Sequence, residues 1–228
     1  MSHPRRRVLQ GLTAGGLGLW MSRLLAAGAQ PVAPGLRQIE GDVRVNGQPA
    51  AEGRVVMVGD AVTTGPNSRV VYVLGQDAYL LRDNSRVEHQ FDGVKGVLRV
   101  VTGKVLAVFG KGDKRIETST ATVGIRGTGA YLEVAADQVY FCLCYGKADI
   151  TPLANPAEGL SIETRYHEKP MVIGRAPGAV MRAAAVINHT DDELVMLEAL
   201  TGRKPPFLAP TSGGGNRQGV GPNRGRGY

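Results

Sequence analysis

The chain has 228 residues, enough for one ordinary domain with appendages or for two very small domains. Its 32 glycines and 5% aromatic content indicate many turns and short strands rather than a helical bundle. The formal charge of +7 lies at the ends, because residues 1–29 and 203–228 hold nine of the 27 basic residues and none of the 20 acidic ones. Residues 30–202 therefore carry 18 basic against 20 acidic residues, a balance of −2. Nucleic-acid binding requires a basic footprint on the fold, so we expect no nucleic-acid partner.

Residues 1–29 have the three parts of a secretory signal. Arg5 and Arg6 lie in a charged segment that resembles the twin-arginine consensus, and Ala29 ends a small-residue cleavage site. Residues 11–21 are apolar but diluted by glycine, and are shorter than the roughly 20 residues that cross a bilayer. We expect the twin-arginine translocase to recognise Arg5 and Arg6, cleavage after Ala29, and a periplasmic mature chain without a transmembrane helix. An ordinary secretory signal with adjacent arginines is the alternative.

The next part of the chain predicts a linker at residues 30–38 and a single β domain at residues 39–175. Asn46 and Gly47 follow a short apolar strand pattern and predict a hairpin with a type I′ turn. A further turn is expected at Thr102 and Gly103. The expected strands are residues 43–45, 54–58, 69–74, 78–81, 97–102, 104–109, 115–118, 130–135, 139–145, 161–164 and 171–173. Strands this short and evenly spaced predict an all-β fold, either a single β-sandwich or a β-helix-like roll.

Residues 176–209 predict a C-terminal extension with one helix at about 191–201. Thr190 can cap this helix, Glu193 completes a capping box, and Gly202 ends it. We expect the helix to cover an edge or an open end of the β fold. Residues 210–228 are rich in Gly and Arg and lack apolar periodicity, so they predict a disordered tail.

Three blocks of sequence, in order along the chain, resemble the FecR domain. Residues 59–69 match its Gly-Asp-x-[Val/Ile]-x-Thr-Gly-x-x-Ser block, and residues 103–109 match the strand pair that follows Leu98. Residues 118–128 match the signature Thr-Pro-x-Ala-x-x-[Gly/Ala]-Val-Arg-Gly-Thr, with Ser119 in place of the proline. The resemblance covers about residues 39–150 and implies a periplasmic β fold used for sensing or binding.

Within that signature, Gly124, Arg126, Gly127 and Thr128 predict a tight turn between strands, because glycine tolerates positive φ angles. Arg126 is expected to hydrogen-bond carbonyl groups of neighbouring turns rather than a ligand. The best-known family members are inner-membrane regulators with a cytoplasmic anti-sigma segment and a membrane helix before this domain. The sequence departs from that pattern, which argues against direct control of a sigma factor.

The only two cysteines, Cys142 and Cys144, lie two apart in a predicted strand, so both should face the same side, opposite Tyr145. Their Cα atoms should then lie about 6.6 Å apart, at the upper edge of disulfide geometry. They could be buried reduced thiols, or a disulfide that is strained unless a bulge brings the two together. They could also hold a soft metal ion, with His167 or His189 completing the site. Cys142, Cys144 and His167 are the candidate metal ligands.

The sequence contains no Gly-x-Ser-x-Gly elbow, no His-Glu-x-x-His and no recognisable pair of catalytic carboxylates, so we expect no enzyme. It favours a non-enzymatic periplasmic FecR-like module that binds or senses a partner protein, a cell-wall polymer or a small ligand. The alternative is a periplasmic metal- or redox-active protein that uses Cys142, Cys144 and His167.

Overall fold

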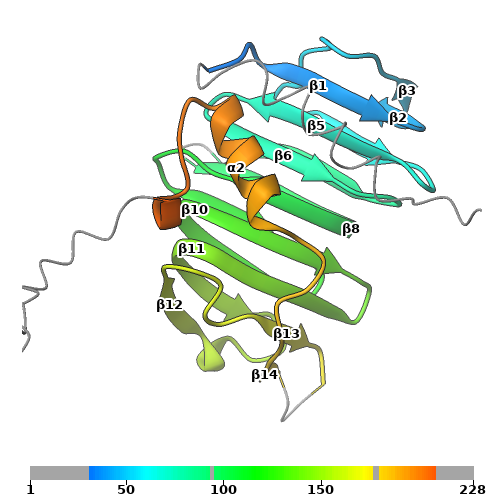
Figure 1. Ribbon diagram of the computed structural model, residues 1–228. Helices are drawn as coiled ribbons and strands as arrows, with labels where there is room; N and C mark the ends of the chain where they lie inside the picture. Colours follow the sequence, from blue (N-terminus) through cyan, green and yellow to red (C-terminus); the bar gives the residue numbers. More distant parts are fainter. Residues whose placement is uncertain (1–30, 93–94, 177–179, 209–228) are drawn as a thin grey trace, which may run out of the picture.

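The computed structural model describes residues 31–92, 95–176 and 180–208 (Figure 1). The predicted signal, with Arg5, Arg6 and Ala29, and the predicted tail lie outside these residues. The described chain is mostly strand with one α-helix, which confirms the all-β prediction. The strands are β1 Gly35–Glu40, β2 Val43–Val45, β3 Gln48–Pro49, β4 Ala61–Thr64, β5 Arg69–Leu74, β6 Asp77–Leu81, β7 Arg86–Asp92, β8 Lys95–Val108, β9 Lys114–Glu117, β10 Ala121–Val134, β11 Gln138–Pro152, β12 Leu160–Thr164, β13 Met171–Gly174 and β14 Met181–Ala183. The helix is α2 Asp191–Leu200, and short 3-10 turns span Pro156–Glu158 and Pro206–Leu208.

All 14 strands belong to one hydrogen-bonded sheet, antiparallel apart from the β8–β9 pair. The sheet folds over into two layers because its three longest strands, β8, β10 and β11, have different partners along their length. Residues 105–108 of β8 pair with β6, whereas its earlier part pairs with β7. In the same way β10 pairs with β9 through its first half and with the end of β8 through its second half.

The facing sides of the two layers form one continuous apolar core. Val62 and Ile116 enter it from one layer, and Tyr72 and Leu132 enter it from the other. Alternation along the strands leaves a second apolar cluster on the outer face of β5, β6, β8, β10 and β11. Helix α2 lies across this outer face and contributes its leucines to the cluster (Figure 1). The fold is thus a two-layered β roll of the predicted all-β class. Its helix covers an outer face of the sheet rather than the expected edge or open end, because that face carries the second apolar cluster.

Helix α2 has the predicted boundaries and cap. The Thr190 side chain accepts from the Glu193 backbone N–H, and the Glu193 carboxylate accepts from the Thr190 N–H. Gly202, with a φ of +72°, follows the helix end. Within the described residues no helix is both long and apolar enough to cross a membrane.

Two predictions near the N-terminus are wrong. The predicted linker at residues 30–38 is too long, since strand β1 begins at Gly35 and its Leu36 is fully buried. Residues 54–58 form no strand, because only Val56 is buried and its apolar neighbours point into solvent. The Arg54 carbonyl accepts from the Leu36 N–H, and the chain then turns towards β4.

The predicted turn at Thr102 and Gly103 is instead a bend inside the continuous strand β8. Gly103 has a φ of +93°, and a Cβ placed there would lie 2.4 Å from the Cα of Ser85. The Ser85 hydroxyl also accepts from the Lys104 N–H, which fixes the bend. Glycine is therefore required at the corner where β8 passes between layers.

The predicted turn of the FecR-like signature is likewise part of a continuous strand, β10, with a register shift between Arg126 and Gly129. Gly127 has a φ of +56°, whereas the φ of Gly124 is not positive. The Arg126 side chain is exposed and pairs with Asp113 at 3.4 Å rather than with carbonyl groups. Thr128 is fully buried, and its carbonyl accepts from the Phe109 N–H. Gly127 thus supplies the left-handed backbone conformation of a β-bulge.

Candidate metal centre

Strand β11 carries both cysteines on the outer face of its layer, towards helix α2. Ala130 pairs with Leu143 and Gly129 pairs with Tyr145, so Cys144 is an extra residue in β11. This β-bulge interrupts the alternation and puts Tyr145 on the same face as the cysteines. The prediction that Tyr145 faces the opposite side is therefore wrong. Both cysteines are fully buried and neither forms a disulfide.

His167 reaches the cysteines from the loop between β12 and β13. Its backbone has a φ of +51°, in the left-handed region that residues other than glycine rarely adopt. The backbone N–H of His167 donates to the Cys144 carbonyl at 3.0 Å, and its Nδ1 lies 3.5 Å from the Cys142 Sγ. The loop thus holds the imidazole directly over the β-bulge.

His189 reaches the same place from the segment that enters helix α2, one residue before the cap Thr190. Its Nε2 lies 3.5 Å from the Cys144 Sγ, and its ring stacks on Tyr131 with centroids 4.6 Å apart. The preceding residue, Asn188, has a φ of +54° and donates to Glu133. The turn at Asn188 therefore directs the imidazole to the cysteines.

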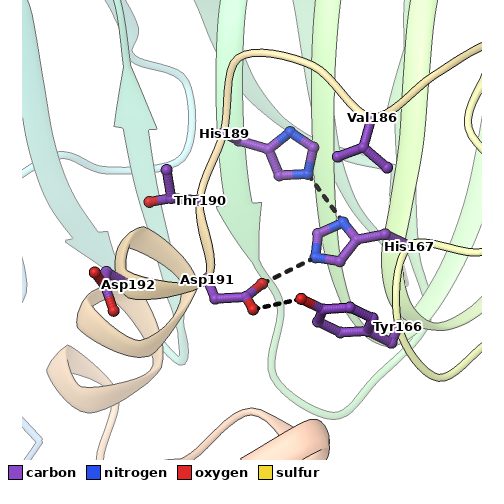
Figure 2. Close-up of a pocket in the computed structure, with 7 residues that line it drawn as sticks. All are labelled: Tyr166, His167, Val186, His189, Thr190, Asp191 and Asp192. Atoms are coloured by element: carbon purple, nitrogen blue, oxygen red, sulfur yellow. Dashed lines mark hydrogen bonds and ion pairs between the residues drawn. The ribbon is translucent and has the colours of Figure 1, made fainter.

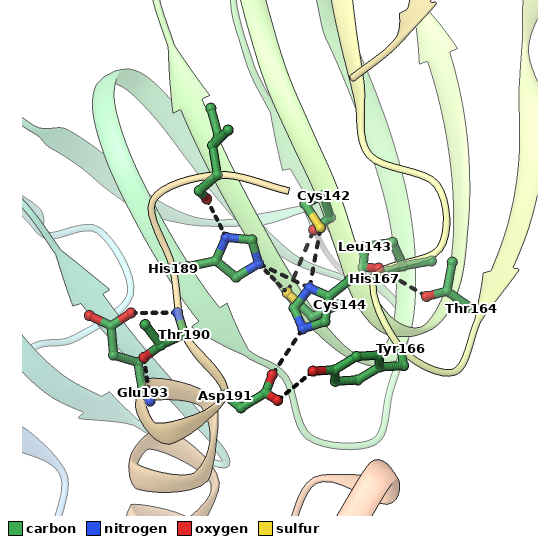
Figure 3. A network of polar contacts seen from close by, with 11 residues as sticks. Cys142, Leu143, Cys144, Thr164, Tyr166, His167, His189, Thr190, Asp191 and Glu193 are labelled. Atoms are coloured by element: carbon green, nitrogen blue, oxygen red, sulfur yellow. Dashed lines mark hydrogen bonds and ion pairs between the residues drawn. The ribbon is translucent and has the colours of Figure 1, made fainter. Parts of the chain in front are cut away.

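Four potential metal ligands therefore converge (Figure 3). The ligand atoms of Cys142, Cys144, His167 and His189 all lie within 4.8 Å of one another. The two histidine nitrogens that face inward are 3.1 Å apart. The four residues come from one strand, one loop and the segment that enters a helix. These three segments are separate in the sequence, and folding brings them together.

Each histidine is oriented by a hydrogen bond on its outward nitrogen. His167 Nε2 lies 3.3 Å from the Asp191 carboxylate, and His189 Nδ1 lies 2.6 Å from the Ile187 carbonyl oxygen. A carbonyl only accepts hydrogen bonds, as does a carboxylate in its ionised form, so the protons of the neutral rings belong on the outward nitrogens. The inward nitrogens then present lone pairs. Metal-binding histidines in proteins are oriented in this way.

The thiols and His167 form one electrostatic unit. A hydrogen bond from Cys144, assisted by His167 and His189, lowers the pKa of Cys142 to about 4 although burial acts in the opposite direction. Burial, followed by the influence of Cys142, raises the pKa of Cys144. Burial lowers the pKa of His167, but Cys142 and Asp191 outweigh it, so this pKa is raised. The site therefore holds one thiolate readily and resists a second without a compensating cation.

An open pocket of about 380 Å³ lies beside the two histidines of this cluster (Figure 2). The two histidines line it together with Tyr166, Asp191 and Asp192. Tyr166 donates to the Asp191 carboxylate at 2.7 Å and so holds the group that orients His167. An ion from solvent would meet the histidines first and the buried sulfurs behind them.

No family model matches this chain, and no curated protein matches it in sequence. Two crystal structures of a candidate anti-sigma factor from Parabacteroides distasonis match part of it, each with a TM-score of 0.46 and 9% identity. Each match covers 54% of this chain and 59% of that chain, so this chain spans less than two thirds of that protein. The functional argument therefore rests on the site.

The structure brings together the three candidate ligands predicted from sequence, Cys142, Cys144 and His167, and adds His189, the alternative fourth ligand. The sequence did not predict that Asp191 orients His167. An acidic residue in the first turn of a helix is already expected from its favourable interaction with the helix dipole, so Asp191 did not stand out. The sequence also did not predict that the Tyr131 ring supports His189. Tyr131 lies far from every ligand in sequence, and Asp191 follows His189 by two residues but orients His167 from a different loop, so no spacing motif marks either role.

The ligand set fits a tetrahedral ion of the zinc type. With Zn–S bonds of about 2.3 Å and Zn–N bonds of about 2.0–2.1 Å, the edges of such a tetrahedron measure about 3.3–3.8 Å. The contacts between ligand atoms are 3.5, 3.5 and 3.1 Å, and all four atoms lie within 4.8 Å. Small side-chain rotations would complete the tetrahedron. Two thiolates and two imidazoles are also the ligands that borderline and soft metals prefer.

Proposed function

We propose that this protein is a non-enzymatic periplasmic module, of FecR-like type, that binds or senses a transition metal ion of the zinc class. Cys142, Cys144, His167 and His189 are the proposed ligands. The observation that carries the proposal is the convergence of their four ligand atoms within 4.8 Å. The oriented histidines add to it, because they direct two lone pairs at one point.

Charge supports a divalent ion. Two thiolates, two neutral imidazoles and one divalent cation sum to zero, so the ion would replace protons in the buried site without adding net charge. The pKa of Cys144 is raised because burial and the neighbouring Cys142 disfavour its thiolate form. A bound cation would stabilise that thiolate.

The closed ligand set argues for binding rather than catalysis. Catalytic zinc sites in proteins keep one position for water or substrate, whereas four protein ligands characterise structural sites. With four ligands from this chain, an ion would have no open position for a substrate. The open pocket beside the histidines would serve as the route by which the ion enters and leaves.

Elemental analysis of the full chain, purified under reducing conditions and titrated with Zn²⁺, tests the proposal. We expect about one tightly bound ion per chain, and intense thiolate-to-cobalt absorption when Co²⁺ replaces Zn²⁺. Cys142→Ser and His189→Ala should each lower metal affinity by at least about tenfold. The control His89→Gln, at a buried histidine that packs against Tyr72 and Tyr79, should bind Zn²⁺ as the unchanged chain does. Absence of stoichiometric Zn²⁺ from reduced protein would overturn the proposal.

The periplasmic location rests on the sequence of residues 1–29. Replacing both Arg5 and Arg6 with lysine should leave the precursor in the cytoplasm, because the translocase distinguishes arginine from lysine at these positions. Arg7→Lys is the matched control, since it leaves the arginine pair in place. Processed periplasmic protein in cells that express the double variant would exclude this export route.

A further inference from the structure

The two thiols have the arrangement of a redox pair. Both are free, both lie on the outer face of β11, and their sulfurs are within 4.8 Å of each other. A sulfur–sulfur bond of about 2.05 Å requires them to approach further, which side-chain rotation in one strand can supply when the Cα atoms are within reach of disulfide geometry. The β-bulge at Cys144 gives that residue freedom that a regular strand lacks.

The imidazoles of His167 and His189 lie between these sulfurs and the described pocket. Both cysteines are fully buried, and the pocket of about 380 Å³ is lined by His167 and His189 rather than by the cysteines. A bulky protein disulfide could not pass between the two imidazoles without displacing them. A hydroperoxide such as H₂O₂ has only two heavy atoms and needs far less space.

We propose that Cys142 and Cys144 form a peroxide-sensitive dithiol whose oxidation to a disulfide and whose metal binding exclude each other. This inference rests on the proposed metal-binding function. Cys142 is the residue that reacts first, because the inward Nδ1 lone pair of His167 lies 3.5 Å from its Sγ and can accept the thiol proton, whereas the Cys144 Sγ donates to the Cys142 carbonyl at 3.8 Å. Cys144 is the resolving residue.

The chemistry balances in two steps. The Cys142 thiolate attacks one oxygen of the hydroperoxide, the O–O bond breaks, and a sulfenic acid forms while the other oxygen leaves and takes up a proton from the site. The Cys144 sulfur then attacks the Cys142 sulfur, an S–S bond forms, and hydroxide leaves with the Cys144 proton as water. Two thiols and one H₂O₂ thus give one disulfide and two waters, with the peroxide reduced by two electrons.

The disulfide and the bound metal ion exclude each other because both require the two cysteine sulfurs. A disulfide has no thiolate to offer, so the oxidised site would retain only His167 and His189, too few ligands to hold an ion tightly. Conversely, a bound ion would engage both thiolates and remove the nucleophile. The surrounding fold should survive either state, because Arg82–Glu193 at 2.8 Å and Tyr145–Glu198 at 2.5 Å hold α2 independently of the cysteines.

The test compares the full chain freed of metal with a chelator and the same chain loaded with Zn²⁺, each treated with H₂O₂. In the metal-free chain we expect a mass loss of about 2 Da and loss of both thiols without intermolecular dimers. The loaded chain should react at least about tenfold more slowly and release Zn²⁺ as it oxidises. In Cys144→Ser, the sulfenic acid on Cys142 should persist and be trapped by dimedone, whereas Cys142→Ser should give far less adduct.

The outcomes separate the two proposals. If Zn²⁺ binds but peroxide yields only added oxygen or intermolecular dimers, the redox inference fails and the metal site stands. If the intramolecular disulfide forms but the reduced chain binds no Zn²⁺, the metal site and its mutual exclusion with the disulfide both fail. If Zn²⁺ remains bound to fully disulfide-bonded protein, the mutual exclusion is wrong although each part occurs.

Discussion

The backbone N–H of His167 donates to the carbonyl oxygen of Cys144 at 3.0 Å, so two of the proposed ligands are joined by a hydrogen bond that involves neither side chain. The bond holds the loop after β12 over the β-bulge and helps to maintain the left-handed φ of +51° at His167. Such a conformation costs of order 1–3 kcal/mol in a non-glycine residue and persists where its surroundings enforce it. The imidazole is therefore positioned before any ion arrives.

Removing the carboxylate behind His167 should weaken metal binding. Asp191→Asn removes the charge that holds the Nε2 proton of His167, and loss of such a partner typically costs about 10–100-fold in metal affinity. Competition titration of Zn²⁺ against a chelator measures the change.

Asp192→Asn is the matched control for that prediction. Asp192 lies in the same first helical turn and lines the same pocket, but its side chain is exposed. Both variants lose one negative charge at the helix N-terminus, so the difference between them reports the hydrogen bond to His167. Equal losses of affinity in the two variants would show that Asp191 acts only through its charge.

The features of this fold that the sequence predicts correctly are those that depend on residues close together in the chain. The cap at Thr190 and the hairpin turn at Asn46 and Gly47 are set by side chains within a few positions, and the structure contains both. The shared face of Cys142 and Cys144 follows from strand periodicity in the same way.

The remaining features depend on contacts between distant segments. The β-bulge that moves Tyr145 to the outer face arises from the pairing of β11 with Gly129 and Ala130, and no property of residues 142–145 alone specifies it. The meeting of His167 with His189 depends on two left-handed residues, His167 itself and Asn188, in separate loops. Only the folded sheet brings those loops together, so the fourth ligand could be named as an alternative but not placed.

The bend of β8 gives a stability prediction. Gly103→Ala should destabilise the fold by about 3 kcal/mol or more, because it combines a positive φ with a Cβ only 2.4 Å from the Cα of Ser85. Gly59→Ala is the control, since Gly59 has a nearly identical φ of +99° and open space where its Cβ would lie. Urea unfolding of both variants should give a clearly larger loss for Gly103→Ala. Equal losses would mean that backbone strain, and not the contact with Ser85, dominates at the bend.

A buried histidine outside the metal site should make the fold sensitive to acid. His89 is 3% exposed, its Nε2 lies 2.9 Å from the Tyr72 hydroxyl, and it packs edge-on against the Tyr72 and Tyr79 rings. Burial lowers the pKa of His89 to about 4, and Asp60 opposes this only in part. The fold therefore keeps the ring neutral under conditions in which an unfolded chain would protonate it.

Between pH 6.5 and about 4 the unfolded chain binds a proton at His89 that the folded chain does not, so the free energy of unfolding should fall as the pH is lowered through this range. The neutral ring's contribution is fully present above pH 6.5, and its loss is on the order of 3 kcal/mol. His89→Gln can keep a hydrogen bond to Tyr72 but cannot titrate, so its unfolding free energy should decline less steeply with acid. Urea titrations from pH 7 to pH 4, with chelator present to remove metal effects, measure both slopes. Parallel slopes for the two proteins would show that His89 is not the group responsible.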